Sequence, residues 1–169
     1  MKKVSLLLIL ITTIASAQLR LGLDVSRELS MSGIEAEKAD GMGFTLGYEQ
    51  MLLSLVGVGA EYSLAGDEGI DMLYGYAVGK IPVGFPMARG IIRAGYSLPM
   101  GDASDFYEAG LAYGVGLRVK PPLFPVGIEA LYTIHNLEMK SDGDDFSEML
   151  MSLLELKYNV LTVTATYSF

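Results

Sequence analysis

Residues 110–119 read GLAYGVGLRV, a segment in which two kinds of residue alternate at every position. One set of alternate positions holds large apolar side chains: Leu111, Tyr113, Val115, Leu117 and Val119. The other set holds three glycines, an alanine and an arginine. Because successive side chains of a β-strand point to opposite faces of the sheet, the segment predicts a strand with one bulky apolar face and one small, partly charged face.

The same alternation with a period of two residues recurs along the rest of the chain. The further segments are 19–26, 42–49, 56–64, 72–79, 92–98, 126–134 and 161–169. Within residues 72–79 we assign Met72, Tyr74, Tyr76 and Val78 to the apolar face, against Leu73, Gly75, Ala77 and Gly79. No apolar face of these segments carries a charge, so the pattern predicts eight strands with one consistently apolar side.

Glycine is concentrated on the opposite, small face of the predicted strands. The glycines assigned to it are Gly22, Gly43, Gly47, Gly57, Gly59, Gly75, Gly79, Gly95, Gly110, Gly114, Gly116 and Gly127. A closed eight-stranded barrel requires such a face, because its interior is only just wide enough for side chains to fill. The alternative, a lipocalin-like soluble barrel with the apolar face inside, would expose the glycines and crowd many aromatic rings into the interior. The sequence therefore predicts an all-β, eight-stranded, antiparallel, up-and-down transmembrane β-barrel with lipid outside.

The first 17 residues have the features of a secretory signal peptide. Met1-Lys2-Lys3 is a basic start, residues 4–14 are an apolar stretch of 11 residues, and Ala15-Ser16-Ala17 matches an A-x-A cleavage site. The alternative of a membrane anchor is disfavoured, because a spanning helix needs about 20 apolar residues. We therefore expect a cleaved signal peptide at residues 1–17 and an exported barrel domain at residues 18–169.

Composition excludes several other classes of protein. The 169-residue chain has a net charge of −8, which makes a nucleic-acid partner improbable on electrostatic grounds. It is 51% hydrophobic, which argues against disorder, and it has no cysteine. Disulfides, thiolate metal sites and thiol nucleophiles are therefore excluded.

The predicted connections differ in charge between the two ends of the barrel. With a periplasmic N-terminus, the outward connections are 30–40, 65–69, 99–106 and roughly 139–147, and these are rich in Asp and Glu. The periplasmic connections 50–55, 81–88 and 120–125 contain no acid and hold most of the prolines. Lys80, Arg89 and Lys120 flank these turns, and we expect their long side chains to extend toward lipid headgroups. Residues 146–156 fit either a short rim helix or an extension of the last strand.

The last seven residues, VTATYSF at 163–169, end in Phe169 with Tyr167 on the same face. With the eight segments, they make the chain resemble the small outer-membrane β-barrel proteins, the OmpA/OmpX-like barrels. The resemblance implies a cell-envelope protein in the outer membrane of a diderm bacterium, with outer-membrane lipid and lipopolysaccharide around it. It also implies that Tyr167 and Phe169 are the signal read by the barrel-assembly machinery. The acidic loops are expected to face a possible extracellular ligand, and divalent cations could link them to lipopolysaccharide phosphates.

Seven charged residues fall on the predicted inner face. They are Arg20, Asp24, Glu49, Glu61, Arg93, Arg118 and Glu129. Buried charges persist only when they are paired and hydrogen-bonded, so we expect a Glu/Arg network that plugs the lumen. The same charges could instead line a narrow, gated, porin-like pore, and this alternative remains open.

A catalytic function has little support in the sequence. The only histidine, His135, is predicted to point inward near the outer end of its strand, with no serine beside it on that face of the local sequence. Asp142-Gly143-Asp144-Asp145 lacks the spacing of an EF-hand calcium loop. We therefore predict no enzyme, no cofactor and no metal site, and a structural or surface-interaction role. A small passive channel is the main alternative, and a lipid-modifying outer-membrane enzyme is a weaker one.

Overall fold

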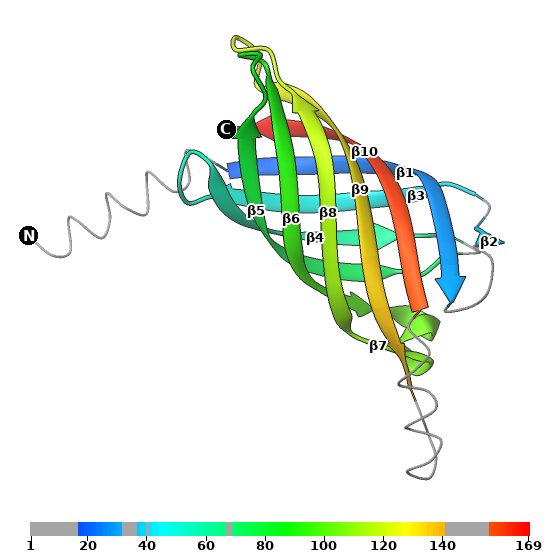
Figure 1. The fold of residues 1–169 in the computed structure, drawn as a ribbon. Helices are drawn as coiled ribbons and strands as arrows, with labels where there is room; N and C mark the ends of the chain where they lie inside the picture. The colour runs from blue at the N-terminus through cyan, green and yellow to red at the C-terminus, as the bar shows by residue number, and fades with distance from the viewer. Residues whose placement is uncertain (1–16, 32–36, 40, 67–68, 141–155) are drawn as a thin grey trace, which may run out of the picture.

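The computed structural model describes residues 17–31, 37–39, 41–66, 69–140 and 156–169. These residues form an almost entirely β structure (Figure 1). The strands are β1 (Ala17–Met31), β2 (Glu37–Lys38), β3 (Gly43–Met51), β4 (Val56–Leu64), β5 (Met72–Pro82), β6 (Ala88–Pro99), β7 (Tyr107–Glu108), β8 (Gly110–Val119), β9 (Val126–Met139) and β10 (Leu156–Ser168). A short 3₁₀ helix, η1 (Gly101–Asp105), precedes β7. No helix among the described residues is long and apolar enough to cross a bilayer.

The eight long strands close into a barrel. Each pairs antiparallel with the next long strand, and β10 pairs with both β9 and β1. Leu19 of β1 lies opposite Tyr167 of β10 on one side and opposite Tyr48 of β3 on the other. The two-residue strands β2 and β7 pair antiparallel with residues near the ends of β1 and β9 and do not interrupt this cycle. The prediction of a closed, eight-stranded, antiparallel barrel is confirmed.

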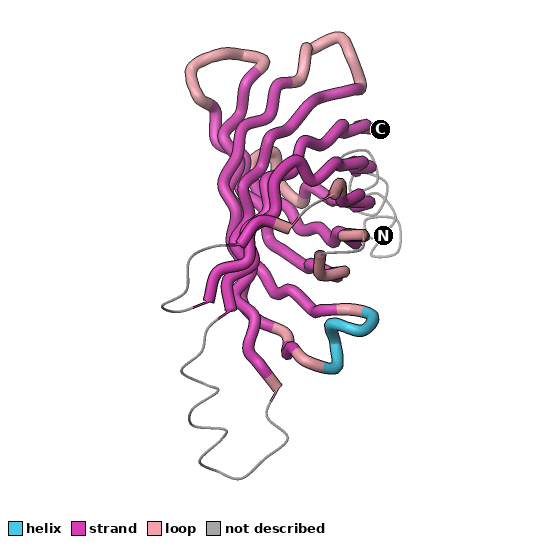
Figure 2. The backbone as a smooth tube through the Cα atoms, turned by 90° about the vertical axis from the view of Figure 1, so that its right-hand side faces the viewer, coloured by secondary structure: helices cyan, strands magenta, loops and turns pink. Residues whose placement is uncertain are grey.

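The two ends of the barrel differ in their connections. At the end that we call the terminal end, short turns join β3 to β4, β5 to β6 and β8 to β9. The backbone N–H of Phe169 donates to the carbonyl of Ala17 there, with an N···O distance of 3.2 Å. The opposite end, the loop end, carries η1 (Figure 2). The chain therefore enters and leaves the barrel at the same end.

The outer wall is apolar, as the alternation predicts. In β1, β3, β4, β6, β8, β9 and β10 the large apolar residues assigned to the outer face are turned away from the lumen, and nearly all are exposed. Val115 is 58% exposed and Leu111 is 66% exposed, values typical of surface residues although both are large and apolar. Their neighbours Ala112, Gly114 and Arg118 are buried. The glycine-bearing faces of these strands therefore line the lumen.

The assignment of faces in residues 72–79 is wrong. In β5 the side chains of Met72, Tyr74, Tyr76 and Val78 are buried in the lumen, and Leu73 faces outward. Tyr76 lies opposite Gly59 of β4, and a Cβ atom on Gly59 would come within 2.6 Å of the ring of Tyr76. The small residues of β4 thus leave the room in the lumen that the tyrosine fills.

A second departure from strict alternation occurs in β1. The register of β1 with β10 shifts between Asp24 and Ser26, which marks a β-bulge around Val25. Because the bulge inserts one residue, Arg27 points into the lumen, is 2% exposed and donates a hydrogen bond to the carbonyl of Ala65. Sequence alternation alone does not place Arg27 in the lumen.

Two predictions concern parts of the chain largely outside the described residues. Of the predicted signal peptide only Ala17 is described, at the start of β1, so cleavage before Gln18 stays a prediction. Of residues 146–156 only Leu156 is described, as the first residue of β10. The choice between a rim helix and a strand extension therefore stays open.

Candidate functional site

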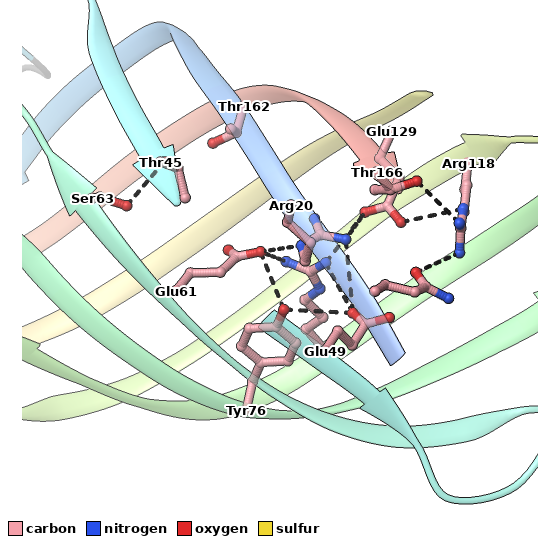
Figure 3. A network of polar contacts seen from close by, with 12 residues as sticks. Arg20, Thr45, Glu49, Glu61, Ser63, Tyr76, Arg118, Glu129, Thr162 and Thr166 are labelled. Atoms are coloured by element: carbon pink, nitrogen blue, oxygen red, sulfur yellow. Dashed lines mark hydrogen bonds and ion pairs between the residues drawn. The ribbon is translucent and has the colours of Figure 1, made fainter. Parts of the chain in front are cut away.

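A network of buried charges crosses the middle of the lumen (Figure 3). Arg20 of β1 contacts Glu61 of β4 at 2.5 Å and Glu129 of β9 at 2.6 Å. Arg93 of β6 contacts the same two glutamates at 2.9 and 3.2 Å, and Glu49 of β3 at 3.3 Å. Two arginines therefore share three carboxylates, and the shared contacts join strands from opposite sides of the barrel.

Tyr76 completes the centre of this network. Its hydroxyl donates to Glu61 at 3.1 Å and lies 3.5 Å from a carboxylate oxygen of Glu49. The guanidinium carbon of Arg93 lies 4.3 Å from the centre of the tyrosine ring, which is a cation–π distance. The inward orientation of β5 thus supplies both a hydrogen-bond donor and an aromatic face to the charged groups.

Lys80 and Gln18 are members of the network that the sequence did not reveal. Lys80 is 3% exposed, and its ammonium group pairs with Glu49 and donates to Gln18 Oε1 at 3.0 Å. The expectation that Lys80 extends outward to headgroups is wrong, for the same reason as in the rest of β5. Lys80 lies at an alternate position to Tyr76 and Val78 and therefore shares their face of the strand. Its charge was the one feature of the sequence that indicated an inward orientation for this face.

Arg118 extends the network toward the terminal end. Its guanidinium lies 3.7 Å from Glu129 and donates to Gln18 Oε1 at 2.7 Å. It also donates to Thr166 at 3.0 Å and to Ser168 at 3.2 Å, both on β10. Inside the lumen, Arg118 therefore links β8 to β10, which lies two strands away.

Asp24 lies apart from the shared ion pairs. Its Oδ1 accepts hydrogen bonds from Thr45 at 3.2 Å and from Thr162 at 2.8 Å, and Thr45 is 3.1 Å from the hydroxyl of Ser63. All seven charged residues named from the sequence are thus buried in the lumen. Six of them share ion pairs, and Asp24 is held by hydroxyl groups nearer the loop end.

The remaining lumen is filled in layers. Toward the loop end, the charges are followed by a cavity of only about 20 Å³ and then by an apolar cluster. The buried members of that cluster are Ile70, Met72, Leu137, Leu156, Tyr158 and Val160. Toward the terminal end, a cavity of about 360 Å³ is lined by Gln18, Lys80, Arg118 and residues of the turns.

His135 has a serine neighbour that the sequence analysis did not find. Ser97 Oγ of β6 lies 2.6 Å from His135 Nδ1, and both residues are buried. Ser97 comes from a strand separated from β9 by β8, so the pair becomes visible only once the strand register is known. The rings of His135 and Tyr74 pack in a T-shaped arrangement, with ring centres 5.4 Å apart.

The acidic outer connections are only partly described. Asp102 and Asp105, in η1, are exposed at the loop end. Residues 142–145 lie outside the described residues. Within the described ranges, no group of three or more His, Cys, Asp or Glu residues is placed to hold a metal ion.

Tyr167 and Phe169 lie on the outer wall at the terminal end. They are 49% and 53% exposed, and their ring centres are 6.2 Å apart. Their role as an assembly signal stays a prediction, because nothing in the geometry tests it.

The comparisons with known proteins rest on structure alone. No protein-family model and no curated protein sequence matches the chain. The crystal structure of Neisserial surface protein A superposes with a TM-score of 0.61 at 11% identity, covering 90% of this chain and 97% of that one. Ail, the attachment invasion locus protein of Yersinia pestis, gives a TM-score of 0.50 at 17% identity, with 90% and 99% of the chains covered.

A designed protein gives a similar match. The solution structure of the de novo designed TMB2.3 has a TM-score of 0.56 at 13% identity, over 92% of this chain and 94% of the designed one. Such low identities establish a shared architecture and not a shared activity. The chain has the fold of the small, eight-stranded outer-membrane barrels.

Proposed function

We propose that this protein is an integral outer-membrane barrel of structural or surface-interaction type, with a lumen plugged by its buried charges. The observation that carries the proposal is the inverted distribution of side chains. Leu111 and Val115 face outward while Arg20 and Arg93 are about 1% exposed inside. A barrel in water would favour the reverse, because burying apolar surface and solvating charges both lower the free energy. Hydrocarbon around the wall accounts for this distribution.

The plug has three successive layers along the lumen. These are the charged network, the cavity of about 20 Å³ and the apolar cluster at the loop end. A cavity of that size holds about one water molecule, so it offers no continuous aqueous path. The layers favour the plug over the alternative of a small passive channel.

Conductance separates the plug from the channel. The purified protein, inserted into planar lipid bilayers at neutral pH, is expected to give no large, steady conductance. A porin-like barrel inserted under the same conditions serves as the positive control for the recording. Steady channels in the wild-type protein, with a conductance proportional to salt concentration, would refute the plug.

Insertion of a charge tests whether lipid contacts the wall. Val115→Arg places a cation on the outer face of β8 and is expected to cost about 2–4 kcal/mol of folding free energy in a bilayer near the midplane. The matched control is Leu123→Arg, in the turn after β8, where the residue is 93% exposed. Unfolding titrations in lipid vesicles measure both variants. Equal stability of the two would argue against a lipid-embedded wall.

The pair formed by Ser97 and His135 does not change the proposed non-catalytic role. A serine beside a histidine is the first element of a nucleophilic site. Here the pair adjoins a cavity of about 20 Å³, which has no room for a lipid substrate. This argues against the lipid-modifying enzyme.

The proposed partners follow from the proposed location. They are outer-membrane lipid and lipopolysaccharide around the wall, and the barrel-assembly machinery acting on Tyr167 and Phe169. A ligand of the acidic outer loops is a further proposal, supported by the exposed Asp102 and Asp105. Surface interaction is also suggested by the names of two proteins with this fold, a surface protein and an attachment invasion protein.

A further inference from the structure

The cavity at the terminal end is lined by an unusual number of cations. Lys80 and Arg118 form its buried floor with Gln18, while Arg89 and Lys120 are half-buried around its rim. The cavity has a volume of about 360 Å³, and none of the described residues that line it is Asp or Glu. The whole chain has a net charge of −8, so this cluster of positive charges is opposite in sign to the net charge of the protein.

The charges around this cavity do not balance. The network and the cavity together contain six cations, namely Arg20, Lys80, Arg89, Arg93, Arg118 and Lys120. Within the part of the chain that the structure describes, only three carboxylates pair with them, those of Glu49, Glu61 and Glu129. Three positive charges are therefore left over, and the cations nearest the opening belong to this surplus.

Two contacts place like charges close together at this end. Arg89 of β6 lies directly opposite Arg118 of β8 in the strand register, and like charges in this arrangement repel. Lys80 and Arg118 both donate to one neutral acceptor, Gln18 Oε1, at 3.0 and 2.7 Å. Partial burial and the nearby Arg118 lower the pKa of Lys120. A bound anion would relieve each of these unfavourable interactions.

We propose that this cavity is a binding site for a phosphate-bearing anion, held by Arg89, Arg118, Lys120 and Lys80. Arginine guanidinium groups match phosphate geometry through paired hydrogen bonds. A surplus of three positive charges suits a group with two or more negative charges better than a single carboxylate. The floor is buried and the rim is partly exposed, so the anion would enter from the terminal end. A lipid headgroup and a soluble phosphate compound share this chemistry.

The test measures the binding of pyrophosphate to the full-length protein in nonionic detergent, by calorimetry at low ionic strength. The key variant is Arg89→Gln/Lys120→Gln, which removes two rim charges and leaves the ion pairs of the plug in place. The matched control is Lys38→Gln/Lys140→Gln, which removes two exposed charges at the loop end. Arg89→Lys/Lys120→Arg keeps both charges, and acetate serves as the monovalent probe.

Saturable pyrophosphate binding by the wild-type protein is expected, with a Kd raised about tenfold or more in Arg89→Gln/Lys120→Gln. The loop-end control and the charge-keeping variant are expected to bind within about threefold of wild type, because both retain the positive charges at the rim of the cavity. Absent binding, equal loss in the loop-end control, or acetate binding as tight as pyrophosphate would overturn the proposal. Unchanged heat-dependent gel mobility shows that each variant still forms the barrel.

A second experiment, with lipids, identifies the source of the phosphate. The protein is incorporated into nanodiscs of phosphatidylcholine with a minority of phosphatidylglycerol, and native mass spectrometry counts the anionic lipids that it retains. Retention by wild type and loss in Arg89→Gln/Lys120→Gln assign the site to a lipid headgroup. Pyrophosphate binding without such retention assigns it to a soluble phosphate compound. The calorimetry needs no bilayer, so its outcome is independent of the proposed membrane role.

Discussion

At the scale of single residues, Arg93 contacts every carboxylate of the shared ion-pair network. It pairs with Glu49, Glu61 and Glu129 and lies over the ring of Tyr76. Its side chain is fully buried, so water cannot replace these partners. A buried charge that loses its partners is much more costly than a buried pair, because the remaining charges stay desolvated. Arg93 and Arg20 therefore pair jointly with all three carboxylates of the network.

Substitution of this residue is expected to destabilise the barrel strongly. Arg93→Met keeps much of the side-chain volume but removes the charge, and we expect a loss of about 3–5 kcal/mol in the free energy of unfolding. Urea titrations in lipid vesicles at neutral pH measure it. Lys38→Met, at an exposed position of β2, is the control and is expected to change stability by less than about 0.5 kcal/mol. A loss below about 1 kcal/mol for Arg93→Met would show that the network is not tightly coupled.

At the scale of elements, β5 shows how strands share the space of a narrow lumen. β5 contributes bulky residues inward, including Tyr74 and Tyr76, where the neighbouring β4 contributes glycines. The other strands could be oriented from sequence because a charged or polar residue marked their inner face. In residues 72–79 both faces are uncharged, and bulk alone gave the wrong side. The room for an inward side chain is therefore set by the residue paired with it on the neighbouring strand.

Two glycine substitutions test this orientation. Gly59→Ala is expected to cost about 1–3 kcal/mol, because its Cβ would lie 2.6 Å from the Tyr76 ring and force it off the charged network. The control Gly75→Ala is on β5 itself and faces outward, with nothing within 4 Å of the added Cβ, so no loss is expected. Unfolding free energies of both variants give the comparison. The reverse order of stabilities would mean that Gly75, and not Tyr76, faces the lumen.

At the scale of the whole molecule, closure of the sheet removes every long unpaired edge. β1 pairs with β10 along nearly its entire length, from Gln18 opposite Ser168 to Met31 opposite Leu156. Unpaired backbone groups are very costly in hydrocarbon, so closed barrels are stable there while open sheets are not. The hydrogen bond from Thr162 of β10 to Asp24 of β1 adds a side-chain link across this seam.

Closure predicts a shift in gel mobility. Unboiled protein in mild detergent is expected to migrate differently from boiled protein, because the closed barrel resists denaturation until heated. Densitometry of the two bands over a temperature series gives the transition. A soluble globular protein of similar mass, run alongside, should show one position throughout. Identical mobility of boiled and unboiled protein would contradict a closed, detergent-resistant barrel.

The sequence by itself determined the period, the number of long strands, the apolar outer wall and seven of the charges that lie in the lumen. These follow from alternation along single strands, which is a local property of the chain. The tertiary structure decided the orientation of β5, the inward turn of Arg27 at the bulge, the burial of Lys80 and the pairing of Ser97 with His135. Each of these depends on residues from other strands meeting across the lumen, and strand register and cross-lumen volume are properties of the closed barrel alone.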